Sequence, residues 1–306
     1  MPIQPTSKIW MDGELVDWDD AKVHILTHSL HYGSGVFEGI RAYETKKGAG
    51  IFRLTDHIER LHRSAHIYMI DVPFSVEELV EATRQTVREN DLTSCYIRPL
   101  VYLGYGEMGL NPILAPVKVS IAVWPWGAYL GDEGIKKGVR MIISSWRRHD
   151  PNIIPPAAKG TGQYINSQMA KLQAVKAGYD EAIMLNPQGM VAEATGENLF
   201  IVRDGTLITP PESAGALVGI TRDSVMTIAR DLGIEVTEAD IMRSDLYTAD
   251  EVFLTGTAAE VVPVREIDDR RIGSGEPGQI TRKIQETFFA AIRGEVEAYS
   301  HWVEVA

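Results

Sequence analysis

Two runs of alternating strand-like and helix-like segments, separated by a stretch with neither period, most constrain the fold of this chain. The first run opens with a hairpin at residues 9–16 around Asp12-Gly13 and has a helix from the capping box Ser75/Glu78 to about Asn90. The second run has hairpins at 181–194 and 198–209, and helices at about 166–176, 221–232 and 280–292. Hairpins mixed with helices in both runs predict an α+β or α/β fold, and not one doubly wound sheet.

Three strands have boundaries that follow from local composition. Residues 50–54 are predicted as a strand, and Thr55 as the cap of the helix that follows. Residues 95–102 are predicted as a strand at the edge or end of its ladder, because Pro99 has no N–H to donate there. A strand at 139–146 is predicted to open the second run.

The stretch between the two runs, residues 124–138, contains tryptophans, glycines and a proline without periodicity. With 306 residues, the chain is long enough for two domains. The sequence therefore predicts a small α+β domain at residues 1–125, an interdomain loop at 126–138 and a larger domain at 139–306.

Charge and cysteine content narrow the classes of partner. The net charge of −12 disfavours nucleic acids and anionic membranes, because phosphates would be repelled over most of the surface. Cys95 is the one cysteine, so no intrachain disulfide can form and a reducing compartment is expected. The first residues have no basic segment before an apolar run, and no uncharged apolar stretch is of bilayer length. We expect a soluble, cytoplasmic protein.

Lys159 is the first candidate for chemistry. It follows the double proline Pro155-Pro156 and lies among small residues, Ala157, Ala158 and Gly160, that leave room beside its amine. A lysine placed in this way suits Schiff-base chemistry, although a solvated loop lysine has the same pattern.

Two segments predict anion-binding cups. Gly219 precedes a helix whose first-turn amides are unpaired, with the Thr221 hydroxyl beside them, and Thr255-Gly-Thr-Ala-Ala-Glu ends a strand in small hydroxyl residues. Two cups and a Schiff-base lysine together suggest a phosphorylated aldehyde cofactor, pyridoxal phosphate. Its ring nitrogen needs a carboxylate opposite it, for which Glu193 is the candidate.

Three histidines, His24, His28 and His31, have a spacing that would place them on one helix face and so could hold a metal. No cysteine or carboxylate cluster supports that interpretation, and Gly33 and Gly35 indicate a turn there instead. We expect ordinary polar or core histidines and no metal.

Several motifs resemble a known family. Lys159 with Tyr164, then Glu193-Ala-Thr-Gly-Glu-Asn-Leu-Phe, Gly219-Ile-Thr-Arg-Asp and Thr255-Gly-Thr-Ala-Ala-Glu resemble the class IV (fold type IV) pyridoxal-phosphate aminotransferases. His31-Tyr-Gly, Val36-Phe-Glu-Gly-Ile-Arg, Tyr96-Ile-Arg-Pro-Leu and Trp126-Gly-Ala-Tyr-Leu-Gly are similar to the branched-chain amino acid aminotransferases within it. The resemblance spans nearly the whole chain in unbroken order. It implies a two-domain fold, with a small α+β domain and a larger pseudo-barrel domain.

The resemblance also implies roles around the cofactor. Lys159 would bind the aldehyde and later move the proton between the substrate Cα and the cofactor C4′. Glu193 would pair with the pyridine nitrogen, and Tyr164 would bond the phenolic oxygen. The phosphate would be bound by Arg60 and by the cup residues Leu217, Gly219, Ile220, Thr221 and Thr257.

For substrates, the resemblance implies branched-chain L-amino acids, with 2-oxoglutarate and glutamate as co-substrates. Tyr96, Thr257 and Ala258 would hold the α-carboxylate, and Arg98 would assist with the more acidic co-substrate. The apolar wall would consist of Phe37, Gly39, Trp126 and Tyr129. Tyr32 and Leu110 would come from the neighbouring subunit of a homodimer with shared active sites. Three such dimers could assemble into a homohexamer.

Four alternatives stay open on the sequence. A D-amino acid aminotransferase or an aminodeoxychorismate lyase of the same fold would present the same lysine and carboxylate. A non-catalytic module that binds aldehydes or metabolites could keep the phosphate cups. The three histidines would make a metal-binding protein the fourth.

Overall fold

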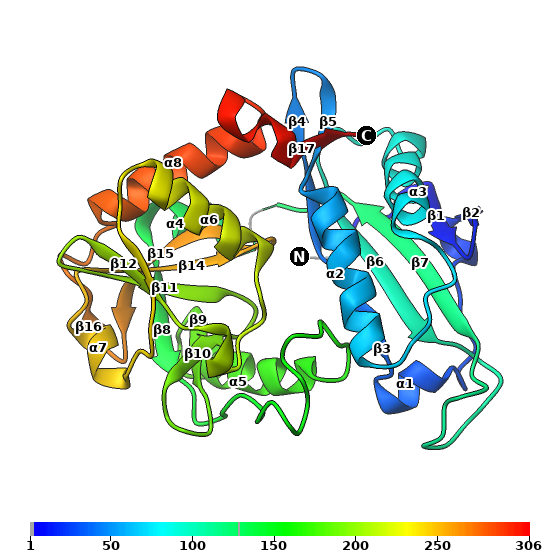
Figure 1. Cartoon of the computed structure of the whole chain (residues 1–306), viewed down its shortest axis with the longest axis horizontal. Helices are drawn as coiled ribbons and strands as arrows, with labels where there is room; N and C mark the ends of the chain where they lie inside the picture. Colours follow the sequence, from blue (N-terminus) through cyan, green and yellow to red (C-terminus); the bar gives the residue numbers. More distant parts are fainter. Residues whose placement is uncertain (1–2, 128) are drawn as a thin grey trace. The chain divides into compact units, whose positions relative to one another are not determined.

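The computed structural model describes residues 3–127 and 129–306. Met1, Pro2 and Ala128, which belong to the N-terminal segment and to the Trp126–Gly131 motif, lie outside the described residues. The chain forms two compact units, which are coloured by sequence in Figure 1. Unit 1 comprises Met1–Trp126, Ala158–Gln163 and Ala290–Ala306, and unit 2 comprises Gly127–Ala157 and Tyr164–Phe289. The expected division into continuous segments 1–125, 126–138 and 139–306 stays a prediction about domains.

Unit 1 is built on an eight-stranded sheet in the order β17-β5-β4-β6-β7-β1-β2, with β3 paired to β6. Its elements are β1 (Lys8–Met11), β2 (Glu14–Asp17), a 3-10 helix (Trp18–Asp20), α1 (His28–Tyr32), β3 (Gly35–Phe37), β4 (Ile40–Thr45), β5 (Gly48–Phe52), α2 (Leu54–Ile67), α3 (Val76–Glu89), β6 (Cys95–Leu103), β7 (Val117–Trp124), a 3-10 helix (Glu297–Trp302) and β17 (Val303–Val305).

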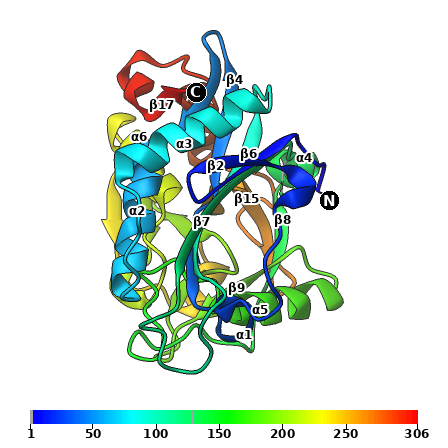
Figure 2. The ribbon, with the colours of Figure 1, turned by 90° about the vertical axis from the view of Figure 1, so that its right-hand side faces the viewer.

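Helices α2 and α3 lie on the same face of this sheet (Figures 1 and 2). Their apolar residues recur at helical spacing, so each helix presents one stripe to the sheet. Ile58, Leu61 and Leu79 are fully buried in one core with Ile97 and Ile121 of the sheet. The predicted capping box is confirmed, because Ser75 accepts from the Glu78 N–H and the Glu78 side chain accepts from the Ser75 N–H.

Two boundary predictions in unit 1 were wrong. Helix α2 begins at Leu54 with Arg53 as its cap residue, while the Thr55 N–H and hydroxyl donate to Glu304. Strand β6 lies inside the sheet, between β4 and β7. Pro99 is tolerated there because its carbonyl and its ring nitrogen face the break between β3 and β4, where Glu38 N–H donates to Pro99 O at 2.9 Å.

Unit 2 is built on a nine-stranded mixed sheet in the order β10-β9-β8-β15-β14-β11-β12-β13, with β16 paired to β15. Its elements are α4 (Gly131–Lys137), β8 (Val139–Ile143), α5 (Tyr164–Lys176), β9 (Glu181–Leu185), β10 (Val191–Ala194), β11 (Asn198–Arg203), β12 (Thr206–Thr209), a 3-10 helix (Glu212–Ala214), α6 (Ile220–Asp231), β13 (Val236–Glu238), α7 (Arg243–Tyr247), β14 (Glu251–Gly256), β15 (Glu260–Ile267), β16 (Arg270–Arg271) and α8 (Gln279–Ile292), whose last turn belongs to unit 1. Parallel and antiparallel pairs occur together, which confirms the predicted α+β class.

Two predictions for unit 2 were wrong: the irregular connection before residue 139 and the end of the strand that follows it. The supposed connection contains a helix at Gly131–Lys137, which has two glycines and therefore little helical signal in the sequence. Strand β8 ends at Ile143, three residues before the predicted end, where the chain turns into a long irregular segment.

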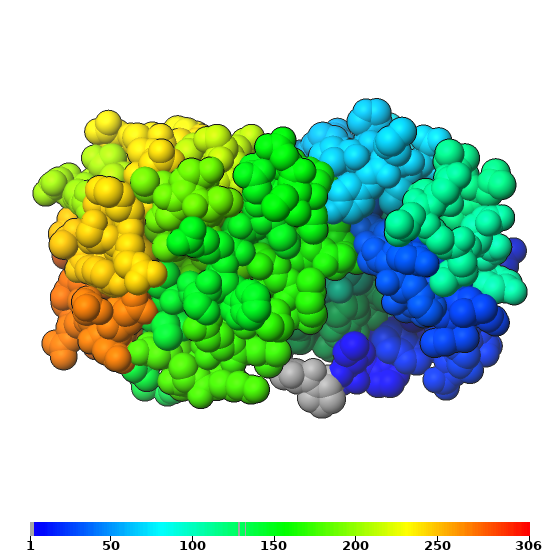
Figure 3. Space-filling view, turned by 90° about the horizontal axis from the view of Figure 1, so that it is seen from below, coloured from blue at the N-terminus to red at the C-terminus, as the bar shows by residue number. Residues whose placement is uncertain are grey.

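Helix α5 exposes four large apolar side chains, Ile165, Met169, Leu172 and Val175. The chain around it, drawn in green, forms part of the surface in Figure 3. None of the helices in the described residues is both long and apolar enough to cross a bilayer.

Candidate active site

The loop that carries Lys159 is attached to unit 1 by main-chain bonds. Val36 of β3 and Gly160 form an antiparallel bridge. Phe37 N–H donates to Lys159 O at 3.0 Å, and Lys159 N–H donates to Ser64 Oγ of α2 at 3.0 Å. Gly160 is required, because a Cβ there would collide with the hydroxyl of Tyr68. Strand β3 and helix α2 therefore fix the backbone from which the lysine side chain extends.

The Lys159 amine lies over an aromatic ring of unit 1. Its Nζ lies 5.1 Å from the ring centre of Phe37, and the guanidinium of Arg98 lies 4.7 Å from the same ring. Tyr96 packs edge-on against Trp126, with ring centres 4.5 Å apart. Gly39 lies against the Tyr96 hydroxyl, so closely that a side chain there would collide with it. The structure thus brings the predicted unit 1 pocket residues together with Lys159.

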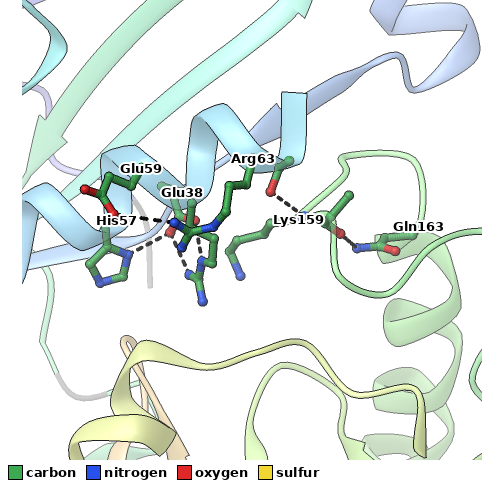
Figure 4. A network of polar contacts seen from close by, with 9 residues as sticks. Glu38, His57, Glu59, Arg63, Lys159 and Gln163 are labelled. Carbon is green, nitrogen blue, oxygen red and sulfur yellow. Dashed lines mark hydrogen bonds and ion pairs between the residues drawn. The ribbon is translucent and has the colours of Figure 1, made fainter. Parts of the chain in front are cut away.

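Arg60 is held by a carboxylate that the sequence reasoning did not assign. Glu38 accepts from Arg60 Nε at 2.7 Å and from Arg60 Nη2 at 2.8 Å, and it also accepts from His57 Nδ1. Figure 4 shows Glu38, His57 and Lys159 close to α2. The guanidinium holds the pKa of Glu38 well below its usual range, against the opposing effect of burial, so this carboxylate stays ionised.

In unit 2, a bulge and an ion pair position Glu193. The register of β10 on β9 shifts between Val191 and Glu193, which redirects the side chain. Arg148 Nη2 lies 2.7 Å from Glu193 Oε1, and Leu217 N–H donates to Oε2 at 3.0 Å. Arg148 and Glu193 are both buried, so the guanidinium neutralises a carboxylate that would otherwise be costly to bury.

The two predicted anion cups lie on either side of Asn198 in unit 2. The Asn198 amide donates to Leu217 O at 2.9 Å, and Asn198 also pairs across the sheet with Thr255. Gly219 has no space for a side chain, because a Cβ would collide with the side-chain amide oxygen of Asn198. As N-cap of α6, Gly219 supplies no side-chain cap to the first helical turn, and the buried Thr255 hydroxyl has no hydrogen-bond partner.

These observations fit pyridoxal phosphate. An uncapped helix N-terminus and an unpartnered hydroxyl are suited to a phosphate. Glu193, paired with Arg148, is suited to a protonated ring nitrogen. In unit 1, Lys159 supplies an amine for an aldehyde, and Arg60 supplies a buried guanidinium for an anion.

The other predicted residues have less distinctive surroundings. Tyr164 is the first residue of α5 and is half-buried, and the Tyr129 ring lies 5.2 Å from Lys171 Nζ. Ile220 and Thr221 are buried in the first turn of α6, and Thr257 and Ala258 form the turn between β14 and β15. Tyr32 and Leu110 are 44% and 91% exposed.

The three histidines considered as metal ligands form hydrogen bonds with other residues of the protein. His28 contacts Ser34 Oγ and Gly109 O, His31 contacts Ile25 O, and His24 Nδ1 accepts from Leu26 N–H. Within residues 3–127 and 129–306, no group of three or more histidine, cysteine or acidic residues could hold a metal ion.

Sequence reasoning missed Glu38, His57, Arg148 and Asn198. Glu38 and Asn198 stood inside motifs quoted for the resemblance, but nothing local marked their roles. Arg148 lies in the irregular segment after β8, with its N–H bonded to Leu185 O. Its pairing with Glu193 depends on strand order, which single-residue patterns do not reveal.

A second buried carboxyl group, Glu197, lies close enough to Glu193 to interact with it electrostatically. Burial and the neighbouring Glu181 raise the pKa of Glu197 to about 8, and Glu193 contributes in the same direction. Glu181 is itself bound by Lys171 Nζ and by the Thr195 hydroxyl, each at 2.6 Å. Glu197 is therefore mostly protonated at neutral pH, which spares Glu193 a second nearby negative charge.

Comparisons with known proteins agree with the geometry. Residues 35–267 match the family described as amino-transferase class IV. A branched-chain-amino-acid aminotransferase of Pseudomonas aeruginosa is 51% identical over 294 residues, 96% of this chain and 95% of that protein. One from Escherichia coli K12 is 48% identical, with 99% of each chain covered.

Solved structures give the same similarity. A branched-chain amino acid aminotransferase from the source abbreviated T.th., solved with pyridoxamine 5′-phosphate, has a TM-score of 0.96 and 49% identity, with 99% of each chain covered. The Escherichia coli branched-chain amino acid aminotransferase also has a TM-score of 0.96, at 48% identity, covering 98% of this chain and all of that one. These likenesses confirm the two-domain type IV fold.

Replacing Glu197 by glutamine should stabilise the protein increasingly as pH rises from about 5 to 9. The folded state holds the Glu197 proton up to a pKa of about 8, whereas an unfolded glutamate loses it near 4.5, so wild-type stability falls across this window. Glutamine cannot ionise and escapes that loss. Thermal unfolding at several pH values measures the difference. Glu235→Gln at an exposed site is the matched control, and a pH-independent difference for Glu197→Gln would contradict the assignment.

Proposed function

This chain belongs to the class IV amino-transferase family, and we propose that it moves the amino group of L-leucine, L-isoleucine and L-valine to 2-oxoglutarate. The products are the branched-chain 2-oxo acids and L-glutamate. It is a pyridoxal-phosphate-dependent branched-chain amino acid aminotransferase. One arrangement in unit 1 carries the proposal. It combines the Lys159 amine, the aromatic rings of Phe37, Tyr96 and Trp126, and the guanidinium of Arg98.

When bound, pyridoxal phosphate supplies an aldehyde that reacts with amines and a protonated ring that accepts the electron pair left on the substrate Cα. Lys159 would hold the cofactor through its Nζ. The same amine would serve as the base that accepts the substrate Cα proton and returns it. The main-chain bonds of its loop keep the amine in place for both tasks.

The remaining cofactor residues bind and orient. Glu193 would accept from the protonated ring nitrogen, and its bonds to Arg148 and Leu217 fix the position of its carboxylate. Tyr164 would donate to the phenolic oxygen. Arg60 and the cup residues Leu217, Gly219, Ile220, Thr221 and Thr257 would bind the phosphate.

The substrate residues explain a dual specificity. Tyr96, Thr257 and Ala258 hold the α-carboxylate that all substrates share. Phe37, Gly39, Trp126 and Tyr129 favour apolar side chains by excluding water, although such a wall separates single methylenes only weakly. Arg98, stacked on Phe37, binds the second carboxylate of 2-oxoglutarate or glutamate.

The same proposal includes a homodimer in which Tyr32 and Leu110 complete the neighbouring subunit's site, and which can assemble further into a hexamer. Exposed apolar side chains of unit 1 support it, since they need cover in solution: Val23, Ile25, Leu26, Leu30, Tyr32, Tyr105, Met108, Leu110, Ile113 and Leu114. The apolar stripe of α5 would suit the hexamer contact. We place the enzyme in the cytoplasm, in keeping with its free, buried Cys95.

The alternatives are less well supported. Relatives similar over nearly the full chain are branched-chain-amino-acid aminotransferases, and neither a D-amino acid aminotransferase nor an aminodeoxychorismate lyase is favoured.

A spectroscopic titration tests the function. The cofactor absorbance band of purified holoenzyme should shift on addition of L-leucine, L-isoleucine, L-valine or L-glutamate, because each donates its amino group to the cofactor. D-Leucine is the matched control and should leave the band unchanged. A preference for D-leucine would replace the proposal by a D-amino acid enzyme. An unchanged band with every L-amino acid would indicate a non-catalytic binding protein.

Glu193→Gln should lower kcat by about a hundredfold or more, since it removes a preorganised charge that acts mainly in the transition state. The fold should be nearly unchanged, because glutamine keeps the shape and can still accept from Leu217 N–H. Steady-state kinetics and circular dichroism measure the two effects, with Glu235→Gln as control. An unchanged rate would remove Glu193 from the site.

A further inference from the structure

Glu38 stands at the centre of a buried charged network in unit 1. It lies between β3 and β4 and is 0% exposed. Its two oxygens receive three bonds from helix α2: two from Arg60, at 2.7 and 2.8 Å, and one from His57 Nδ1 at 2.8 Å. Figure 4 shows Glu38 and His57 beside the helix, with the exposed pair Glu59 and Arg63 on the same element.

This network is poorly explained by stability alone. Taking a carboxylate and a guanidinium out of water is costly, and well-packed apolar residues of similar size often stabilise a protein equally well or better. Burial lowers the pKa of His57, so its imidazole is neutral and donates one N–H to Glu38. The network therefore consists of one ion pair, Glu38 with Arg60, and a neutral His57 that donates to the same carboxylate.

The geometry fixes the orientation of Arg60. Two parallel N–H···O bonds to Glu38 define the plane of the guanidinium and therefore the direction of its Nη1. His57, at i−3 on the helix, holds Oε2 of the same carboxylate. An arginine on a flexible side chain is thereby converted into a fixed cation.

The same helix face also fixes the lysine loop. Ser64, one turn after Arg60, accepts from Lys159 N–H at 3.0 Å. Helix α2 thus sets the position of the amine-bearing loop and of the guanidinium together. A cofactor that carries both an aldehyde and an anionic group needs these two positions to be fixed relative to each other.

We propose that Glu38, supported by His57, is a positioning residue that aims Arg60 at the cofactor phosphate, so that the protein selects phosphorylated over unphosphorylated pyridoxal. This inference rests on the proposed function. Glu38 touches neither the substrate nor the reacting atoms; it acts through Arg60.

The test compares two probes on the apoprotein, pyridoxal 5′-phosphate and pyridoxal, by calorimetric or fluorescence titration. Glu38→Gln removes the charge that holds the guanidinium, so it should weaken binding of the phosphorylated probe by about tenfold or more. Binding of pyridoxal should change much less, since it has no phosphate for Arg60. Glu59→Gln is the matched control, because it makes the same change in the exposed pair with Arg63 on the same helix, and should alter neither affinity.

Variants at His57 keep the inference testable where Glu38→Gln does not fold. His57→Leu removes one bond to Glu38 and should cause a smaller, still selective, loss. His57→Asn can restore that bond from its amide and should recover the affinity. An equal loss for both probes, or no loss for either, would overturn the inference while leaving the function intact. Failure of the wild-type protein to bind pyridoxal 5′-phosphate would overturn the proposed function itself.

Discussion

The antiparallel pairing between β3 and the loop at residues 158–163 is the constraint on which the rest of unit 1 depends. It joins segments more than a hundred residues apart in sequence and fixes the backbone of Lys159. The chain just before β3 approaches this loop so closely that Gly33 is needed, because a Cβ there would lie 2.6 Å from the Gly162 Cα. The reactive amine is therefore placed by main-chain geometry, and only its own side-chain rotamer stays adjustable.

Each unit also contains one buried carboxylate paired with one buried guanidinium, Glu38 with Arg60 and Glu193 with Arg148. In both pairs the partner stabilises a charge that burial alone would remove. The roles differ: Glu38 holds the cation that would bind an anion, whereas Arg148 holds the anion that would bind a protonated nitrogen. Burial and the neighbouring Glu181 and Glu193 raise the pKa of Glu197 to about 8, so Glu197 adds no second negative charge beside Glu193 at neutral pH. Preorganised charges of this kind allow a protein to stabilise charge that develops during a reaction.

Local signals predicted the elements that depend on local chemistry. The Asp12-Gly13 turn and the Ser75/Glu78 box are in place because each forms within a few residues. The prediction for Pro99 was wrong because the gap that accommodates it comes from β3 and β4, more than fifty residues earlier. Lys159 and the cups were identified from composition and resemblance, but Arg148 and Glu38 became visible only when the sheets placed them beside Glu193 and Arg60.

If the Lys159 amine carries the cofactor aldehyde, covalent trapping will label that residue. Purified holoenzyme is reduced with sodium borohydride, digested, and analysed by mass spectrometry to locate the phosphopyridoxyl group. We expect about one label per chain, on the peptide that contains Lys159, and loss of that label when the enzyme is reduced after conversion by L-glutamate. A stoichiometric label on another lysine, such as Lys171, would contradict it.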